Sequence, residues 1–156
     1  MTSFLSTFVN KIDSKGRVSV PAPFRACLAA ETYQGVIAYS SLTDPAIDAF
    51  GRSVLEELNR RSLSRNLDAG DFERTLLGSA DSLMETVMAL AFELPFDGQG
   101  RVILPPALLE AAGLNGHVTF VGRGSKFQIW SPSTFEQHQR DAVTKLKQKL
   151  NQDLNQ

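Results

Sequence analysis

The sequence contains a single cysteine, Cys27, in 156 residues, so an intrachain disulfide framework is excluded. The absence of disulfides is typical of a reducing compartment. The first residues lack the basic segment and the long apolar run of a secretory signal. The longest apolar stretch, around residues 87–92, is too short to span a bilayer. We therefore expect a cytoplasmic protein without a membrane partner.

The sequence also lacks an excess of positive charge, because its formal net charge is −1. This excludes a protein coated in basic residues, but it does not exclude local contacts with phosphate groups, which depend on where the charges lie. Residues 81–100 contain four acidic residues and no lysine or arginine. Residues 1–25 instead hold one acid, Asp13, against four cations: Lys11, Lys15, Arg17 and Arg25.

A nine-residue motif occurs twice, at an offset of 84 residues. Asp13–Pro21 reads DSKGRVSVP, and Asp97–Pro105 reads DGQGRVILP. Such self-similarity indicates a repeated structural unit. Alternating apolar residues before each aspartate and after each arginine predict two half-buried strands. The intervening Asp-x-x-Gly predicts a tight hairpin, because aspartate bonds its downstream backbone and glycine accepts a positive φ.

Each motif is followed by a short helix, a glycine and an apolar run. In the second copy Pro106 suits the first helical position and Gly113 suits the position after the helix end. Third strands are expected from Gly35 and Gly116, and fourth strands at residues 47–50 and 126–130. A unit of about 50 residues cannot bury a large core alone. We therefore expect two β–turn–β–α–β–β repeats that interleave their strands in a pseudo-twofold barrel.

Helical spacing of apolar residues predicts helices over residues 51–66, around residues 72–77, and from Ser82 onward. A capping box at Ser133–Glu136 predicts a C-terminal helix from Phe135 to Leu150 with a frayed tail. The expected fold class is therefore α+β, two tandem β-rich units with peripheral helices. The expected division is a first repeat (4–50), a helical connection (51–87), a second repeat (88–131), and a C-terminal helix and tail (132–156).

The central functional candidates are Arg17 and Arg101. One interpretation is that each contacts a phosphate or a guanine from a turn presented to DNA. The other is that each forms an ion pair with Asp13 or Asp97 that only braces its turn. The first turn adds the cation of Lys15, whereas the second, Gly98-Gln99, is neutral, so the first repeat is favoured as the DNA-reading face.

Lys11, Lys15 and Arg25 are supporting candidates, although an isolated surface lysine is more often simply solvated. Cys27 lies among apolar residues and is expected to be a packed thiol. The two histidines, His117 and His138, have no partners at metal-ligand spacing, so we expect no metal site. No grouping of serine, histidine and carboxylate suggests catalysis, and we expect no enzyme activity, no cofactor and no small-molecule substrate.

The tandem Asp-x-x-Gly-Arg-Val-x-(Val/Leu)-Pro signature resembles the SpoVT–AbrB superfamily of swapped-hairpin DNA-binding domains. Two copies in a chain of this length resemble the MraZ family of regulators. The stretch Val9–Pro21 is close to that family's first motif. Leu77–Ala80 and the segment from Phe120 to Trp130 are also similar. The resemblance covers roughly residues 4–145.

This resemblance implies a sequence-specific, nucleoid-associated regulator of transcription that acts on the promoter of a division and cell-wall gene cluster. It implies double-stranded DNA with direct repeats as the partner, and DNA contacts from basic residues such as Arg25. It also implies a ring-shaped homo-oligomer, which agrees with two non-identical halves offering heterologous surfaces. The alternative is a protein-interaction or antitoxin-like module of the same fold, in which DNA binding is secondary.

Overall fold

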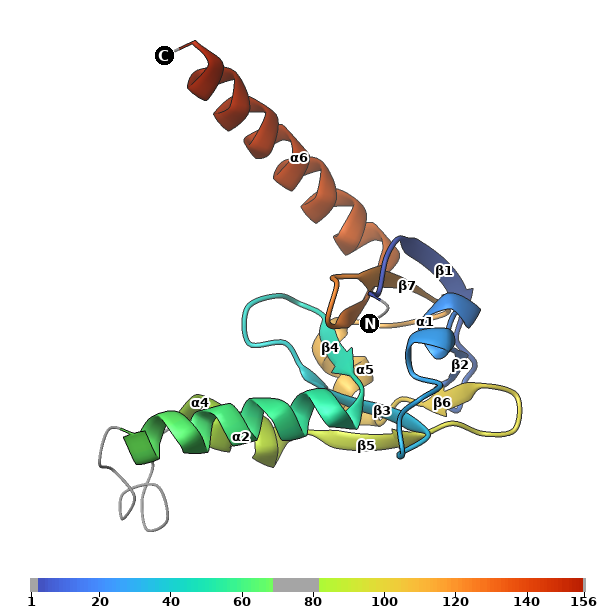
Figure 1. Cartoon of the computed structure of the whole chain (residues 1–156). Helices are drawn as coiled ribbons and strands as arrows, with labels where there is room; N and C mark the ends of the chain where they lie inside the picture. The colour runs from blue at the N-terminus through green and yellow to red at the C-terminus, as the bar shows by residue number, and fades with distance from the viewer. Residues whose placement is uncertain (1–2, 69–81, 156) are drawn as a thin grey trace.

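The computed structural model describes residues 3–68 and 82–155, which form one α+β unit (Figure 1). The predicted helix around residues 72–77 lies outside the described residues. The strands are β1 (Thr7–Lys11), β2 (Arg17–Ser19), β3 (Gly35–Ser40), β4 (Ile47–Phe50), β5 (Phe92–Pro95), β6 (Arg101–Ile103), β7 (His117–Gly122) and β8 (Phe127–Trp130). The described helices are α1 (Ala22–Cys27), α2 (Arg52–Asp68), α4 (Ser82–Leu90), α5 (Pro106–Ala112) and α6 (Pro132–Leu154).

The strands of the two repeats interleave in two antiparallel sheets. A six-stranded sheet has the order β1-β7-β8-β4-β3-β5, and β2 pairs with β6 in a second sheet. In the large sheet β1 of the first repeat corresponds to β5 of the second, β3 corresponds to β7, and β4 corresponds to β8. Exchanging the members of each pair gives the same strand order in reverse. The two repeats are therefore equivalent in topology, with the midpoint between β4 and β8, where Asp48 lies opposite Gln128.

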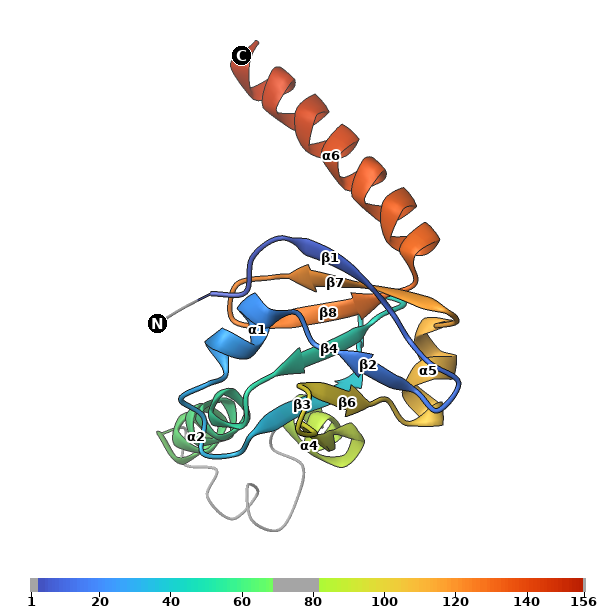
Figure 2. The ribbon, with the colours of Figure 1, turned by 90° about the vertical axis from the view of Figure 1, so that its right-hand side faces the viewer.

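The sequence predicts a pseudo-twofold barrel, but no closed barrel is observed among the described residues. The large sheet is open, with β1 and β5 as its edges, because β2 and β6 pair with each other. An isolated bridge between Ile12 and Val18 links β1 to β2 across the first turn. The α+β class is thus confirmed, and the barrel is replaced by an open sheet with a two-stranded sheet beside it (Figure 2).

The main core draws on both repeats and contains one face of each sheet together with α1 and α5. Phe24 on α1 is fully buried, and its ring contacts those of Phe4, Phe8, Phe120 and Phe127 at centroid distances of 5.0–6.3 Å. The second repeat contributes equivalent apolar residues from β6, α5 and the link between them, which are Val102, Leu104, Leu108 and Ala112. Because neither repeat encloses this core alone, the two fold as one body.

The remaining helices cover the other face of the large sheet. Helices α2 and α4 contact each other and β3, whereas the start of α6 contacts β7. Phe135 of α6 packs edge-on against the buried ring of Trp130 at 5.6 Å. The ring of His138 also contacts that of Trp130, at 4.6 Å, and beyond it α6 leaves the body (Figures 1 and 2). No helix of the described residues has the length and apolar character that crossing a membrane requires.

The capping box expected at Ser133–Glu136 is wrong. Helix α6 begins earlier, at Pro132, and its N-cap Ser131 makes no side-chain capping hydrogen bond. Proline at the first helical position has a φ suited to the helix and no N–H to satisfy, so it sets the start without a capping side chain. The helix also continues to Leu154, beyond the predicted end at Leu150.

Candidate nucleic-acid interface

The two copies of the motif form the same turn. Asp13 Oδ1 accepts hydrogen bonds from the backbone N–H of Lys15 at 3.0 Å and of Arg17 at 2.9 Å. Asp97 Oδ1 accepts the equivalent bonds from Gln99 at 2.8 Å and Arg101 at 3.0 Å. The glycine of each turn takes a positive φ, 82° in the first copy and 74° in the second. The predicted turn chemistry is confirmed in both copies, but the predicted hairpin is not, because β1 pairs with β7, β5 pairs with β3, and β2 pairs with β6.

Each aspartate also fixes its arginine side chain. Arg17 Nε donates to Asp13 Oδ2 at 2.7 Å, and Arg101 Nε donates to Asp97 Oδ2 at 2.8 Å. Among the described residues, neither guanidinium forms a hydrogen bond through its terminal amino groups. The two side chains remain 36% and 32% exposed. Bracing the turn and contacting a ligand are therefore compatible roles, since the ion pair uses Nε and leaves the terminal amino groups for a ligand.

Hydrogen bonds keep both carboxyl groups ionised. The backbone N–H of Arg101 is the main cause that lowers the pKa of Asp97 to about 2. The backbone N–H of Arg17 likewise holds the pKa of Asp13 below its ordinary value. Because both aspartates stay negatively charged at neutral pH, both arginines stay oriented in the free protein.

The pairing of β2 with β6 brings the two arginines to one surface. Val18 lies opposite Val102, and both are buried. Because side chains alternate along a strand, the flanking residues of both strands point the other way, toward solvent. On this outer face Arg17 lies opposite Ile103, and Arg101 lies opposite Ser19. The arginines are thus diagonal neighbours, which usually lie about 7–8 Å apart.

The turns are held in place by the opposite repeat. The carbonyl oxygen of Gly16 accepts from the N–H of Leu104 at 2.8 Å, and that of Gly100 accepts from Val20 at 3.2 Å. A Cβ at Gly16 would stand 2.7 Å from the Leu104 carbonyl oxygen, so glycine is also needed for this approach. Each turn is consequently positioned by the strand that follows the other turn.

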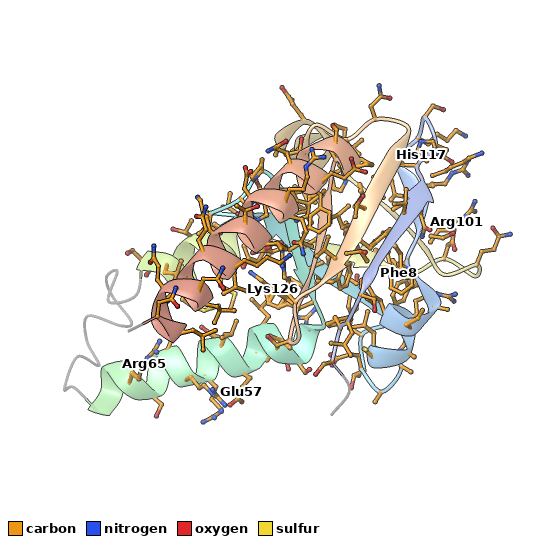
Figure 3. The ribbon with its side chains drawn as sticks, turned by 90° about the horizontal axis from the view of Figure 1, so that it is seen from above. Phe8, Glu57, Arg65, Arg101, His117 and Lys126 are labelled. Carbon is orange, nitrogen blue, oxygen red and sulfur yellow. The ribbon has the colours of Figure 1, made fainter. Side chains whose placement is uncertain are left out.

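Arg25 lies against the second turn, although it belongs to the first repeat. Its Nε donates to the Val20 carbonyl at 3.1 Å, and its guanidinium packs over Gly100, where a Cβ would come within 2.8 Å of it. Lys15 is exposed in the first turn, and Lys11 is exposed at the end of β1, opposite His117. Figure 3 shows Arg101 at the same end of the molecule as His117.

The structure therefore gathers Lys15, Arg17, Arg25 and Arg101 around the β2–β6 sheet and places Lys11 on the strand leading to it. Sequence reasoning missed Ile103, which is 59% exposed on the outer face between the arginines. The alternation along β6 could have placed Ile103 on the face of Arg101, because the two residues are two positions apart, but only the register of β6 against β2 places it opposite Arg17.

Comparisons with known proteins identify relatives of this chain. A family model described as "MraZ protein, putative antitoxin-like" matches residues 87–155. The Transcriptional regulator MraZ of Rickettsia akari (strain Hartford) is 43% identical over 142 residues, which cover 91% of this chain and 90% of the relative. That of Rickettsia bellii (strain OSU 85-389) is 44% identical over 139 residues, covering 88% and 87%.

The chain belongs to the MraZ family. The matches to whole relatives span both repeats, so membership in the MraZ family extends over the two turns and does not rest on the second repeat alone. The relatives carry the name of transcriptional regulators.

Proposed function

We propose that this MraZ-family protein is a sequence-specific DNA-binding transcriptional regulator, and that the outer face of the β2–β6 sheet contacts double-stranded DNA. The observation that carries the proposal is the pair of arginines on this face, each oriented through Nε by an aspartate and each free at its terminal amino groups among the described residues. The names of the relatives support the regulatory role.

The chemistry of this face suits a groove of B-form DNA. An arginine can donate two hydrogen bonds to O6 and N7 of guanine, or bind a phosphate oxygen. Ile103, exposed between the arginines, provides an apolar surface for a thymine methyl group. In this arrangement Arg17 and Arg101 contact guanine bases, and Ile103 adds a preference for thymine.

The first repeat contributes more positive charge to the interface. Lys15 extends from the first turn and Lys11 from the preceding strand, while the second turn carries Gln99 in the matching position. We assign phosphate contacts to the two lysines, since such contacts add affinity without sequence preference. Arg25 holds the second turn through Gly100 and reaches toward the same DNA backbone.

The proposal extends to the cellular setting. The protein acts in the cytoplasm on the nucleoid, at direct repeats in the promoter of a division and cell-wall gene cluster, and it has no enzymatic role. Its two repeats are tandem swapped-hairpin units of the SpoVT–AbrB type. It assembles as a ring-shaped homo-oligomer, so that several turns face the DNA in the same orientation.

A gel shift at fixed salt tests this function, because salt alone alters DNA affinity strongly. The probe is a duplex from upstream of the protein's own gene, and the competitor is the same duplex with shuffled sequence. We expect the native duplex to be retained in a large excess of competitor. Equal affinity for the two duplexes would refute sequence-specific regulation.

The antitoxin-like role is the second candidate, and the description of the matching family model favours it. In that role the protein's main partner is another protein, and the β2–β6 face contributes little. The same gel shift separates the two roles, because DNA binding that is only secondary gives little preference for the native over the shuffled duplex.

A further inference from the structure

We propose that Ser19 and Ile103 set the direction in which each copy of the protein reads its DNA repeat. Ile103 contacts the methyl group of a thymine in one half of the repeat, and Ser19 makes no such contact in the other half. This inference rests on the DNA-binding function proposed above. It names the two residues that give the outer β2–β6 face its polarity.

The outer face of the β2–β6 sheet is symmetric in its backbone and in its arginines. Its two strands read Arg-Val-Ser and Arg-Val-Ile, and both have the same burial pattern of half-buried, buried and exposed residues. Exchanging the strands maps Arg17 onto Arg101 and the register onto itself, with the buried pair Val18 and Val102 at the centre. The face therefore presents one arginine on each side of a local pseudo-twofold axis (Figure 2).

The cations beside the two turns do not give the face a direction. Lys15 is exposed in the first turn, and Gln99 takes its place in the second. Arg25 compensates for this difference, because its guanidinium packs over Gly100 of the second turn. The equivalent residue of the second repeat, Leu109, approaches the first turn and is uncharged. Each turn is thus supplied with one further cation, and contacts of such cations with phosphate carry no sequence information.

Ser19 and Ile103 occupy equivalent positions on the face and differ in chemistry. Ile103 is directly opposite Arg17 and is 59% exposed, whereas Ser19 is directly opposite Arg101 and is also exposed. An apolar side chain in the major groove favours thymine through its methyl group, while a serine hydroxyl bonds to more than one base. The half with Arg17 and Ile103 therefore favours guanine beside thymine, and the other half favours guanine alone.

This difference fixes a reading direction. A two-stranded ribbon fits the major groove of B-form DNA, where every base pair has a distinct pattern of contacts. A fully symmetric face would bind a repeat equally well in both directions, because rotation about the pseudo-twofold axis exchanges identical contacts. Ser19 and Ile103 remove that equivalence. In an assembly whose copies all face the DNA in the same orientation, they favour repeats that point the same way.

The first measurement replaces thymine by uracil, which removes only the methyl group. The full-length protein is titrated at fixed salt with the duplex from upstream of its own gene, carrying uracil at one thymine of one repeat at a time. At one position we expect wild-type binding to weaken about fourfold, the effect of losing one buried methyl group. Ile103→Ser should bind the thymine and uracil duplexes equally, whereas Ile103→Val should remain sensitive.

The second measurement inverts one repeat of the duplex in place, so that it points against the others. The wild type should bind this duplex about fourfold more weakly than the native one, since one methyl contact is lost. Ile103→Ser and Ser19→Ile make the two strands identical by opposite chemical changes, so each variant should bind both duplexes equally. The matched control, Lys15→Gln, should weaken binding to both duplexes alike and keep the wild-type ratio.

Light scattering and thermal melts should show wild-type mass and fold for every variant, because the substituted positions are exposed. If Ile103→Ser lowers the melting temperature, Ser19→Ile decides the orientation test. A wild type that ignores both uracil and inversion, or a symmetric variant that still distinguishes the two orientations, would overturn this inference and leave the DNA-binding function standing. Equal affinity of the wild type for native and shuffled duplexes would overturn both.

Discussion

At the scale of single residues, the second turn depends on Gly100 for two reasons. Its φ of 74° lies in the left-handed region, and the guanidinium of Arg25 occupies the space of a Cβ. Gly98, three residues from Arg101 in the same turn, differs on both counts. A Cβ added at Gly98 would meet no atom within 4 Å, and its φ is not positive.

We therefore expect Gly100→Ala to lower the free energy of unfolding by about 1–2 kcal/mol, the cost of a left-handed non-glycine residue. Gly98→Ala, the matched control, should stay within about 0.5 kcal/mol of the wild type. Urea denaturation measures both. Equal effects of the two substitutions would show that the turn conformation does not limit stability.

The hydrogen bonds that Asp97 accepts, above all the one from the backbone N–H of Arg101, predict a pH dependence of stability. The folded-state pKa is lowered to about 2 from an ordinary 3.8, so the carboxylate stabilises the fold fully above pH 4. That contribution is lost as the pH falls through 2, when the folded protein also becomes protonated at Asp97. Asp97→Asn should therefore be less stable than the wild type at pH 7, and the difference should shrink between pH 4 and pH 2. A difference that does not change with pH would contradict this assignment.

At the scale of secondary-structure elements, the start of α2 is capped by a residue far away in sequence. Glu31 Oε1 accepts from the backbone N–H of Ser53 at 2.9 Å, and Oε2 accepts from the Ser53 hydroxyl at 2.5 Å. A carboxylate here satisfies an unpaired N–H and opposes the positive end of the helix dipole.

Glu31→Ala should cost about 0.5–2 kcal/mol of stability, the usual range for loss of an N-cap. Glu56→Ala, which removes a surface ion pair with Arg52 from the same helix, should cost less than about 0.5 kcal/mol. Thermal melts of the two variants give the comparison. If both lower the melting temperature equally, Glu31 does not act as a cap.

The elements that the sequence predicts well are those whose signals are local. Helix α5 runs from Pro106 to Ala112, with Gly113 left-handed at φ 61°, as its proline and glycine predict. The Asp-Arg turns are predictable for the same reason. The start of α6 is misplaced by sequence because serine and glutamate three residues apart give a capping signal, but Pro132 and the contact of Phe135 with Trp130 fix the helix earlier.

The parts of the site that sequence cannot predict are non-local. The shared face of Arg17 and Arg101 follows from the register of β2 against β6, which lie 84 residues apart in the chain. The packing of Arg25 on Gly100 follows from the same pairing. Sequence patterns identify all three arginines as candidates, but they do not show that Arg17 and Arg101 share one face, because local patterns treat the two turns as separate surfaces.

At the scale of the whole molecule, a head-to-tail assembly predicts the form of the operator. Every copy presents its β2–β6 face in the same orientation, so the DNA site should consist of direct repeats at regular spacing and not of a palindrome. Inserting about half a helical turn between two repeats should therefore weaken binding strongly, while a full turn should restore part of it. Affinity that is indifferent to the insertion would exclude contact by several copies.

The most direct test of the central claim compares the DNA affinity of the wild type with that of Arg17→Ala, Arg101→Ala and the double variant, on the duplex from upstream of the protein's own gene. Each single variant should lose about 1–3 kcal/mol per occupied contact, with the larger loss at Arg17, and the double variant should bind this duplex no better than shuffled DNA. Light scattering and melts should show unchanged mass and fold. A double variant that keeps wild-type affinity, with mass and fold intact, would contradict the assignment of the β2–β6 face to DNA.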